Sequence, residues 1–260
     1  MSAYFHSYLC GRKAAEWLID MAKVLRRILA VLCLLAAVFA IYDHYRKPTN
    51  EEMRARYQDQ KITASMMKSL ARDKKKQFVK FWNCSFEDGA LEALAKSETI
   101  YDVDFKECSG IETLAPLAEM TPLTDLKYET DYALDKPLHE LDAEKLFPVE
   151  MNCQNISLLH WKFKDGLSFL KNFQNSTYVS LWDCAGLDVL PEMPQLKIFQ
   201  VNKSDLSACD LSALAKIKPL YIVKLNECSL ENIDFLAGCG SLEDLELDEN
   251  AVTSLLPLSG

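Results

Sequence analysis

Val79-Lys-Phe81-Trp-Asn-Cys84 decides the fold of this chain, because its pattern of apolar-x-apolar-x-x-Cys returns several times. The other clear copies are Val103-Asp-Phe105-Lys-Glu-Cys108, Val179-Ser-Leu181-Trp-Asp-Cys184 and Val223-Lys-Leu225-Asn-Glu-Cys228. A last copy, Leu245-Glu-Leu247-Asp-Glu-Asn250, has Asn in place of Cys. Self-similarity at a nearly fixed period is the signature of a stacked repeat.

This phrase resembles the leucine-rich repeat, L-x-x-L-x-L-x-x-N/C-x-L. Weaker copies are Leu126-Lys-Tyr128-Glu-Thr-Asp131 and Phe199-Gln-Val201-Asn-Lys-Ser204. Positions 84, 108 and 131 are spaced by 24 and 23 residues, and positions 184, 204, 228 and 250 by 20, 24 and 22. The resemblance covers about residues 78–260 and is nearest to the short bacterial, internalin-like type. It implies an α/β solenoid with a curved parallel sheet of about seven or eight repeats.

The segment between positions 132 and 178 is irregular. One copy of the phrase can be fitted at Leu159-His-Trp161-Lys-Phe-Lys164, and a second at Val149-Glu-Met151. The sequence leaves the repeat register of this segment open.

Four of the nine cysteines fit the repeat, because each of them follows the second apolar residue of its copy by three positions. A small buried thiol with a weak S–H donor can replace the Asn of the repeat. The alternative is a framework of disulfides or metal ligands. There is no C-x-x-C pair, so we expect no metal site and no cofactor.

Residues 28–42 (ILAVLCLLAAVFAIY) form an unbroken apolar run behind a basic N-terminal segment, residues 1–27. A spanning helix needs roughly 20 apolar residues, but Arg27 can snorkel and Tyr42 can lie at the interface. We therefore expect an uncleaved transmembrane signal anchor. A cleaved secretory signal also fits the run, and a buried helix of a soluble protein is the third alternative.

The orientation of this single-pass anchor follows from Arg26 and Arg27, which directly precede the apolar run. The positive-inside rule then places the N-terminus in the cytoplasm. The repeats would lie outside the cytoplasm, at the inner membrane. The many free thiols point the other way, toward a reducing compartment.

Residues 43–77 are expected to hold a linker and a capping helix. Apolar side chains recur at helical spacing across residues 49–77, at Met53, Tyr57, Ala64, Met67 and Ala71. Such a helix would cover the first repeat, because the ends of a solenoid need caps.

Charge is divided unevenly along the chain. Residues 1–77 contain 15 Lys and Arg against 7 Asp and Glu, whereas residues 78–260 contain 14 against 31, a net charge of −17. An acidic solenoid repels nucleic acid and attracts basic partners. We therefore expect a basic protein partner and no nucleic acid, although acidity also serves solubility.

A partner would contact the concave face, which is built from the residues that flank the two apolar ladder positions. The candidate binding residues are Trp82, Asp102, Asp104, Lys106, Lys127, Glu129, Tyr178, Trp182, Gln200, Asn202, Lys224, Asn226, Glu246 and Asp248. Exposed aromatic side chains among charges are typical of interface hot spots, so Trp82 and Trp182 are the leading candidates. Alternatively, each Trp folds over to cover a repeat edge.

The sequence favours binding over catalysis. His160 lies near Asp165 but has no nucleophile near it in sequence, and there is no Gly-rich phosphate loop. Our best hypothesis is a non-enzymatic, membrane-anchored immunity or inhibitor protein that captures a toxin or secreted effector on an acidic concave face. The alternative is a structural or adhesion scaffold that organises envelope proteins. Leu255-Leu-Pro-Leu258 leaves the last repeat without a polar cap, which predicts self-association, cover by the partner, or a minimal cap.

Overall fold

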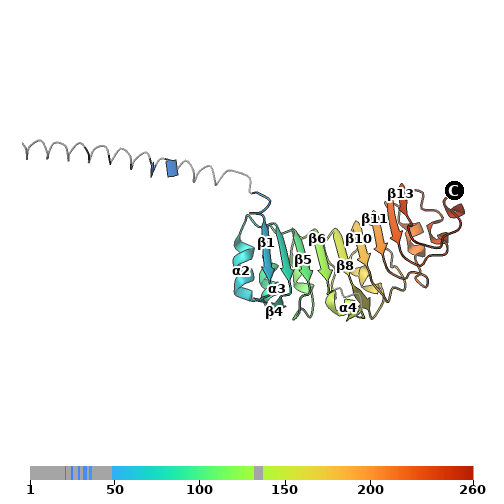
Figure 1. The fold of residues 1–260 in the computed structure, drawn as a ribbon, viewed down its shortest axis with the longest axis horizontal. Coiled ribbons are helices and arrows are strands. Elements are labelled where there is room, and N and C mark those ends of the chain that lie inside the picture. Colours follow the sequence, from blue (N-terminus) through green and yellow to red (C-terminus); the bar gives the residue numbers. More distant parts are fainter. Residues whose placement is uncertain are drawn as a thin grey trace, which may run out of the picture. The chain divides into compact units, whose positions relative to one another are not determined.

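The computed structural model describes residues 49–131 and 137–259, together with seven single positions between 21 and 36. Residues 1–49 and 50–260 form two separate units, and only the second is described in detail. Its main feature is a parallel sheet of nine strands that lie side by side in chain order along a curved coil (Figure 1). The strands are β1 (Arg54–Gln58), β3 (Phe78–Trp82), β5 (Asp102–Lys106), β6 (Asp125–Glu129), β8 (Asn155–Leu159), β10 (Tyr178–Trp182), β11 (Ile198–Asn202), β12 (Ile222–Asn226) and β13 (Asp244–Glu246).

The phrase identified in the sequence forms these strands. Val103 pairs with Val79 on one side and Leu126 on the other, so equivalent residues of successive coils are aligned. Because strand side chains alternate, the two apolar residues of each phrase point into the core. Val103 and Phe105 are completely buried.

Eight of the nine strands end in the same turn. The residue before the ladder position has a left-handed backbone in eight coils, with φ between 49° and 65°. Side chains at the ladder position then bond to the backbone of the turn. The Sγ of Cys228 donates to the carbonyls of Val201 and Asn226, both at 3.3 Å. Asn250 makes more hydrogen bonds than a Cys at this position, because its Oδ1 also accepts from the backbone amides of Cys228 and Leu230. The eight described cysteines are all free, which agrees with thiols that replace Asn.

The outer side of the coil consists mainly of short helical segments. These are α2 (Ala64–Arg72), α3 (Ala90–Leu94), α4 (Ala143–Leu146) and the 3-10 segments η1 (Ala115–Glu119), η2 (Ser168–Asn172), η3 (Ser212–Lys216), η4 (Asp234–Leu236) and η5 (Leu256–Leu258). Two small parallel pairs, β2 (Lys61–Ile62) with β4 (Ser85–Phe86) and β7 (His139–Leu141) with β9 (Trp161–Phe163), follow the turns. The described residues therefore form a leucine-rich-repeat solenoid, as predicted.

The prediction of a helix across residues 49–77 is mostly wrong. The structure has strand β1 at 54–58, paired in parallel with β3, and a helix only at 64–72. Ala55 and Tyr57 occupy the two inward positions, and Gln60 stands at the ladder position. One more coil thus precedes the first copy recognised in the sequence. Thr63 caps the N-terminus of α2, because its side chain accepts from the Met66 amide.

The irregular segment contains a single long coil. Of the two copies fitted there from the sequence, one is out of register and the other forms no strand. Ile156 and Leu158 are the inward residues of β8, so Trp161 occupies the ladder position and Leu159 lies on the concave side. The indole of Trp161 is stacked on Tyr128 and donates to its carbonyl at 3.1 Å. No strand forms at Val149, which is exposed.

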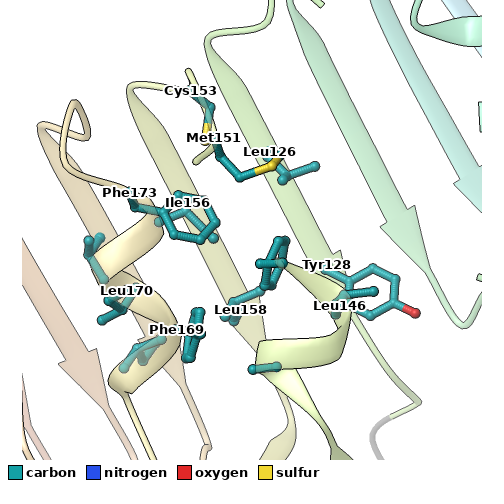
Figure 2. Close-up of a cluster of buried hydrophobic side chains, with 14 of the residues drawn as sticks. Leu126, Tyr128, Leu146, Met151, Cys153, Ile156, Leu158, Phe169, Leu170 and Phe173 are labelled. Atoms are coloured by element: carbon teal, nitrogen blue, oxygen red, sulfur yellow. The ribbon is translucent and has the colours of Figure 1, made fainter. Parts of the chain in front are cut away.

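The extra residues of this long coil contribute to the core. Figure 2 shows Leu146 of α4 and Met151 in one buried cluster with Leu126 of β6 and with Ile156 and Leu158 of β8. Phe169 and Leu170 of η2 complete the cluster and are fully buried. The coil therefore accommodates its additional length on the convex side, and the sheet continues unbroken from β6 to β8.

Most of the expected signal anchor, residues 28–42, lies outside the described residues. Among those that are described, no helix has the length and apolar character needed to cross a bilayer.

Candidate functional site

The concave face of the sheet consists of the first, third and fifth side chains of each strand, which we call the first, middle and last rows. All three point away from the core, because side chains alternate along a strand. Strand register places members of a row side by side, as Asp102 beside Asp125 and Asp104 beside Lys127.

The structure distributes the predicted binding residues over these rows. The first row holds Asp102 and Tyr178. The middle row holds Asp104, Lys127, Gln200, Lys224 and Glu246. The last row holds Trp82, Lys106, Glu129, Trp182, Asn202 and Asn226. Asp248 lies just beyond β13 and is exposed.

The two tryptophans lie on this face with large exposed fractions, 41% for Trp82 and 38% for Trp182. The Nε1 of Trp82 donates to Glu107 at 3.2 Å, and the Nζ of Lys203 lies 6.0 Å from the ring centroid of Trp182. Four strand spacings separate β3 from β10, which is about 19 Å. The two tryptophans therefore form two separate contact points.

Two predicted binding residues are buried. The carboxylate of Glu129 accepts from the ammonium groups of Lys106 at 2.7 Å and Lys127 at 2.9 Å. Burial raises the pKa of Glu129, but the two lysine hydrogen bonds outweigh this effect and the net shift is downward. Asn202 is also buried, and its Nδ2 has no hydrogen-bond partner among the described residues. Both side chains support the face from within and present little surface to a partner.

The concave strands are not acidic overall, which differs from our expectation. Their outward side chains include six cations (Arg54, Arg56, Lys80, Lys106, Lys127 and Lys224) and six anions (Asp102, Asp104, Asp125, Glu129, Asp244 and Glu246). Several of them pair, such as Lys80 with Asp104 at 2.8 Å. Within residues 78–260 the outward strand side chains are four cations and six anions, so most of the net charge of −17 lies outside the concave strands.

A groove of about 430 Å³ crosses the first row from β5 to β11. Its lining residues are Asp102, Asp125, Leu126, Lys127, Asn155, Ser157, Thr177, Tyr178, Lys197, Ile198 and Tyr221. Half-burial raises the pKa of Asp102 to about 6, and the neighbouring carboxylates of Asp125 and Asp104 add to this effect.

Sequence reasoning missed much of this groove. Asn155 and Ser157 were hidden because the register of β8 was not recognised. Ile198 precedes the first apolar ladder residue of its coil and was not assigned to a face. The available signal was the first strand position of every copy, which reads Asp102, Asp125, Tyr178 and Ile198 in the recognised coils that line the groove.

The thiols of the described coils are unsuited to nucleophilic chemistry. Burial raises the pKa of Cys108 and Cys228 to about 11, and that of Cys153, Cys184 and Cys209 to about 12. Thiolates would therefore be rare near neutral pH. Within the same part of the chain, no group of three or more His, Cys, Asp or Glu side chains is arranged to hold a metal ion.

The fold and its open concave face define a leucine-rich-repeat module. Comparison with known proteins gives neighbours in fold only. The chain is 16% identical to an internalin (inlF) from Listeria monocytogenes over 74% of this chain and 53% of that one, with a TM-score of 0.47. It is 14% identical to internalin C2 from the same species over 71% of this chain and 75% of that one, with a TM-score of 0.46. The chain thus spans about half the length of the first internalin. No family model and no curated protein matches the sequence.

Proposed function

We propose that this chain is a non-enzymatic module that binds a protein partner on its concave face. The observation that supports this best is Trp182, a large aromatic side chain that remains 38% exposed in the middle of a continuous sheet. Tryptophan is the residue most enriched among interface hot spots, and burial of its remaining surface would favour binding. Leu159 pairs with it in register on the adjacent strand β8 and extends the contact area.

The partner is expected to be a basic protein. The net charge of −17 on residues 78–260 attracts cations at long range and repels nucleic acid. At short range, the paired charges of the middle row require a partner with both signs of charge. The net charge of the domain thus attracts the partner, whereas the middle row of the concave face contacts it.

Membrane attachment through residues 28–42 is part of the proposal. The unbroken apolar run of residues 28–42, directly behind Arg26 and Arg27, supports it. Under the positive-inside rule, the repeat domain would lie outside the cytoplasm. Carbonate extraction of source-cell membranes tests the anchor, because an anchored chain stays in the pellet. Release into the supernatant would exclude it.

Within this class, we favour an immunity or inhibitor protein that captures a toxin or secreted effector at the membrane surface. An anchored, acidic binding module suits the neutralisation of one basic target. The competing proposal is a scaffold that organises several envelope proteins. The exposed Leu255, Leu256 and Leu258 also favour self-association through the last coil, which a Leu256→Glu substitution should abolish in a sedimentation experiment.

The test is capture of partners by the tagged full-length chain from its source cells. Trp182→Ala should abolish retention of the partner, whereas Val189→Ala should not, because Val189 is an exposed apolar residue outside the concave strands. One dominant basic protein would favour the inhibitor, and several envelope proteins the scaffold. Retention that is equal for wild type and Trp182→Ala would show that Trp182 is not part of the binding surface.

A further inference from the structure

The groove along the first row changes character from one end to the other. At β5 and β6 it presents the carboxylates of Asp102 and Asp125. At β10 and β11 it presents the ring of Tyr178 and the side chain of Ile198, with Tyr221 nearby. A ligand that fits the whole groove therefore needs a polar end and an apolar end.

The two carboxylates are not equally compensated. Asp125 accepts from the Nδ2 of Asn155 at 2.7 Å and from the hydroxyl of Thr124 at 2.6 Å. No described residue donates a hydrogen bond to the carboxylate of Asp102. The positive charges of Arg54 and Lys127 act on Asp102, but the ammonium of Lys127 is directed to Glu129 at 2.9 Å.

The negative charge of Asp102 is therefore poorly compensated by the described residues around it. Its register partner on β6 is another carboxylate, one strand spacing or about 4.8 Å away. Asp104 on its own strand adds a second negative neighbour. Like charges opposite each other on neighbouring strands repel, and a bound cation would remove this repulsion.

We propose that this groove binds an extended segment of the partner protein, with a basic side chain between Asp102 and Asp125 and an apolar side chain against Tyr178 and Ile198. The inference rests on the proposed function and specifies the chemistry of the partner. An arginine suits the acidic end best, because its planar group donates to two carboxylates at once. The tyrosine rings and Ile198 suit a leucine-like side chain.

The geometry also sets the spacing of these two side chains. Three strand spacings separate Asp125 on β6 from Ile198 on β11, which is about 14 Å. An extended segment rises about 3.3 Å per residue, so the two side chains should be about four residues apart. Side chains at positions i and i+4 of an extended segment point to the same side, as the groove requires. The expected motif is basic-x-x-x-apolar.

Short synthetic peptides test this motif on the full-length chain. The probe is acetyl-Arg-Ala-Ser-Ala-Leu-amide, and its matched control carries citrulline, which keeps the shape of arginine without the charge. Affinities are measured by titration calorimetry near pH 7.5. The arginine peptide should bind on the order of tenfold more tightly than the citrulline peptide. Equal affinities would overturn the proposal.

Two further readouts identify the groove as the site. Asp102→Asn should remove the preference for arginine, whereas Glu249→Gln, on the exposed turn after β13, should keep it. Because Asp102 titrates at about 6, wild-type affinity for the arginine peptide should fall about tenfold between about pH 7.5 and pH 5, and less in Asp102→Asn. A preference for arginine that survives Asp102→Asn would place the basic side chain elsewhere and refute the assignment.

The outcomes separate this inference from the proposed function. If Trp182→Ala abolishes partner capture while the two peptides bind equally, the concave face binds the partner but the groove is not a basic-residue site. If the arginine preference is present and sensitive to Asp102→Asn while Trp182→Ala has no effect on capture, the groove is a real site and the Trp182 contact point is wrong.

Discussion

Replacing Asp102 by Asn should make the folded chain more stable near neutral pH. The carboxyl of Asp102 titrates at about 6 in the folded chain, against an ordinary value of 3.8. Half-burial is the main cause, followed by the negative charges of Asp125 and Asp104. The unfolded chain loses its proton more easily than the folded chain, so the ionised form is disfavoured by folding.

The size of this effect follows from the difference in pKa. Each pKa unit corresponds to about 1.36 kcal/mol, so a difference of about two units corresponds to roughly 3 kcal/mol. Asp102 is only half-buried, and solvent screening reduces this to about 1–1.5 kcal/mol. The penalty is fully present above pH 6, decreases as the pH falls from about 6, and vanishes below about pH 3.8.

Urea unfolding of the full-length wild type and Asp102→Asn measures this difference. Near pH 7.5, the variant should unfold at higher urea concentration, with a free energy of unfolding about 1–1.5 kcal/mol greater. Near pH 4, the gain should shrink to a few tenths of a kcal/mol. Glu249→Gln serves as the control and should change stability by less than about 0.5 kcal/mol at both pH values. A loss of stability in Asp102→Asn, or the same gain at both pH values, would refute the reasoning.

Three further predictions concern the coil itself. Leu181→Ala should lower the free energy of unfolding by about 2–5 kcal/mol in urea titrations, because Leu181 is completely buried; a cost below 1 kcal/mol would contradict its place in the core. Gly186→Ala should cost more than Gly238→Ala in the same assay, since both have positive φ but only the Cβ at 186 would meet backbone, 2.3 Å from the carbonyl oxygen of Phe163; equal costs would show that the backbone can move aside. Cys184, buried and with its pKa raised to about 12, should react with a thiol reagent near pH 8 only after denaturant is added, as followed by mass spectrometry; rapid labelling of the native chain would mean that this coil opens.

The four copies of the phrase that begin with Val and have Cys at the ladder position could be read directly from the sequence. The first coil could not, because Ala55 and Tyr57 are followed by Gln60 and also fit a helical spacing. The β8 coil was misread for a different reason. Leu159 and Trp161 alternate as well as Ile156 and Leu158 do, and a shift in register exchanges the two faces of a strand.

The sequence by itself determined the repeat, the inward side chains of most strands and the exposed positions of Trp82 and Trp182. These depend on alternation within five or six residues, which is a local property of the strand. Only the tertiary structure decided which outward side chains meet. Asp102, Asp125 and Ile198 are separated by 23 and 73 residues along the chain, and they share one groove because successive coils stack in register. The charge balance of the concave face was likewise hidden, since a net charge counts residues and stacking decides which of them pair.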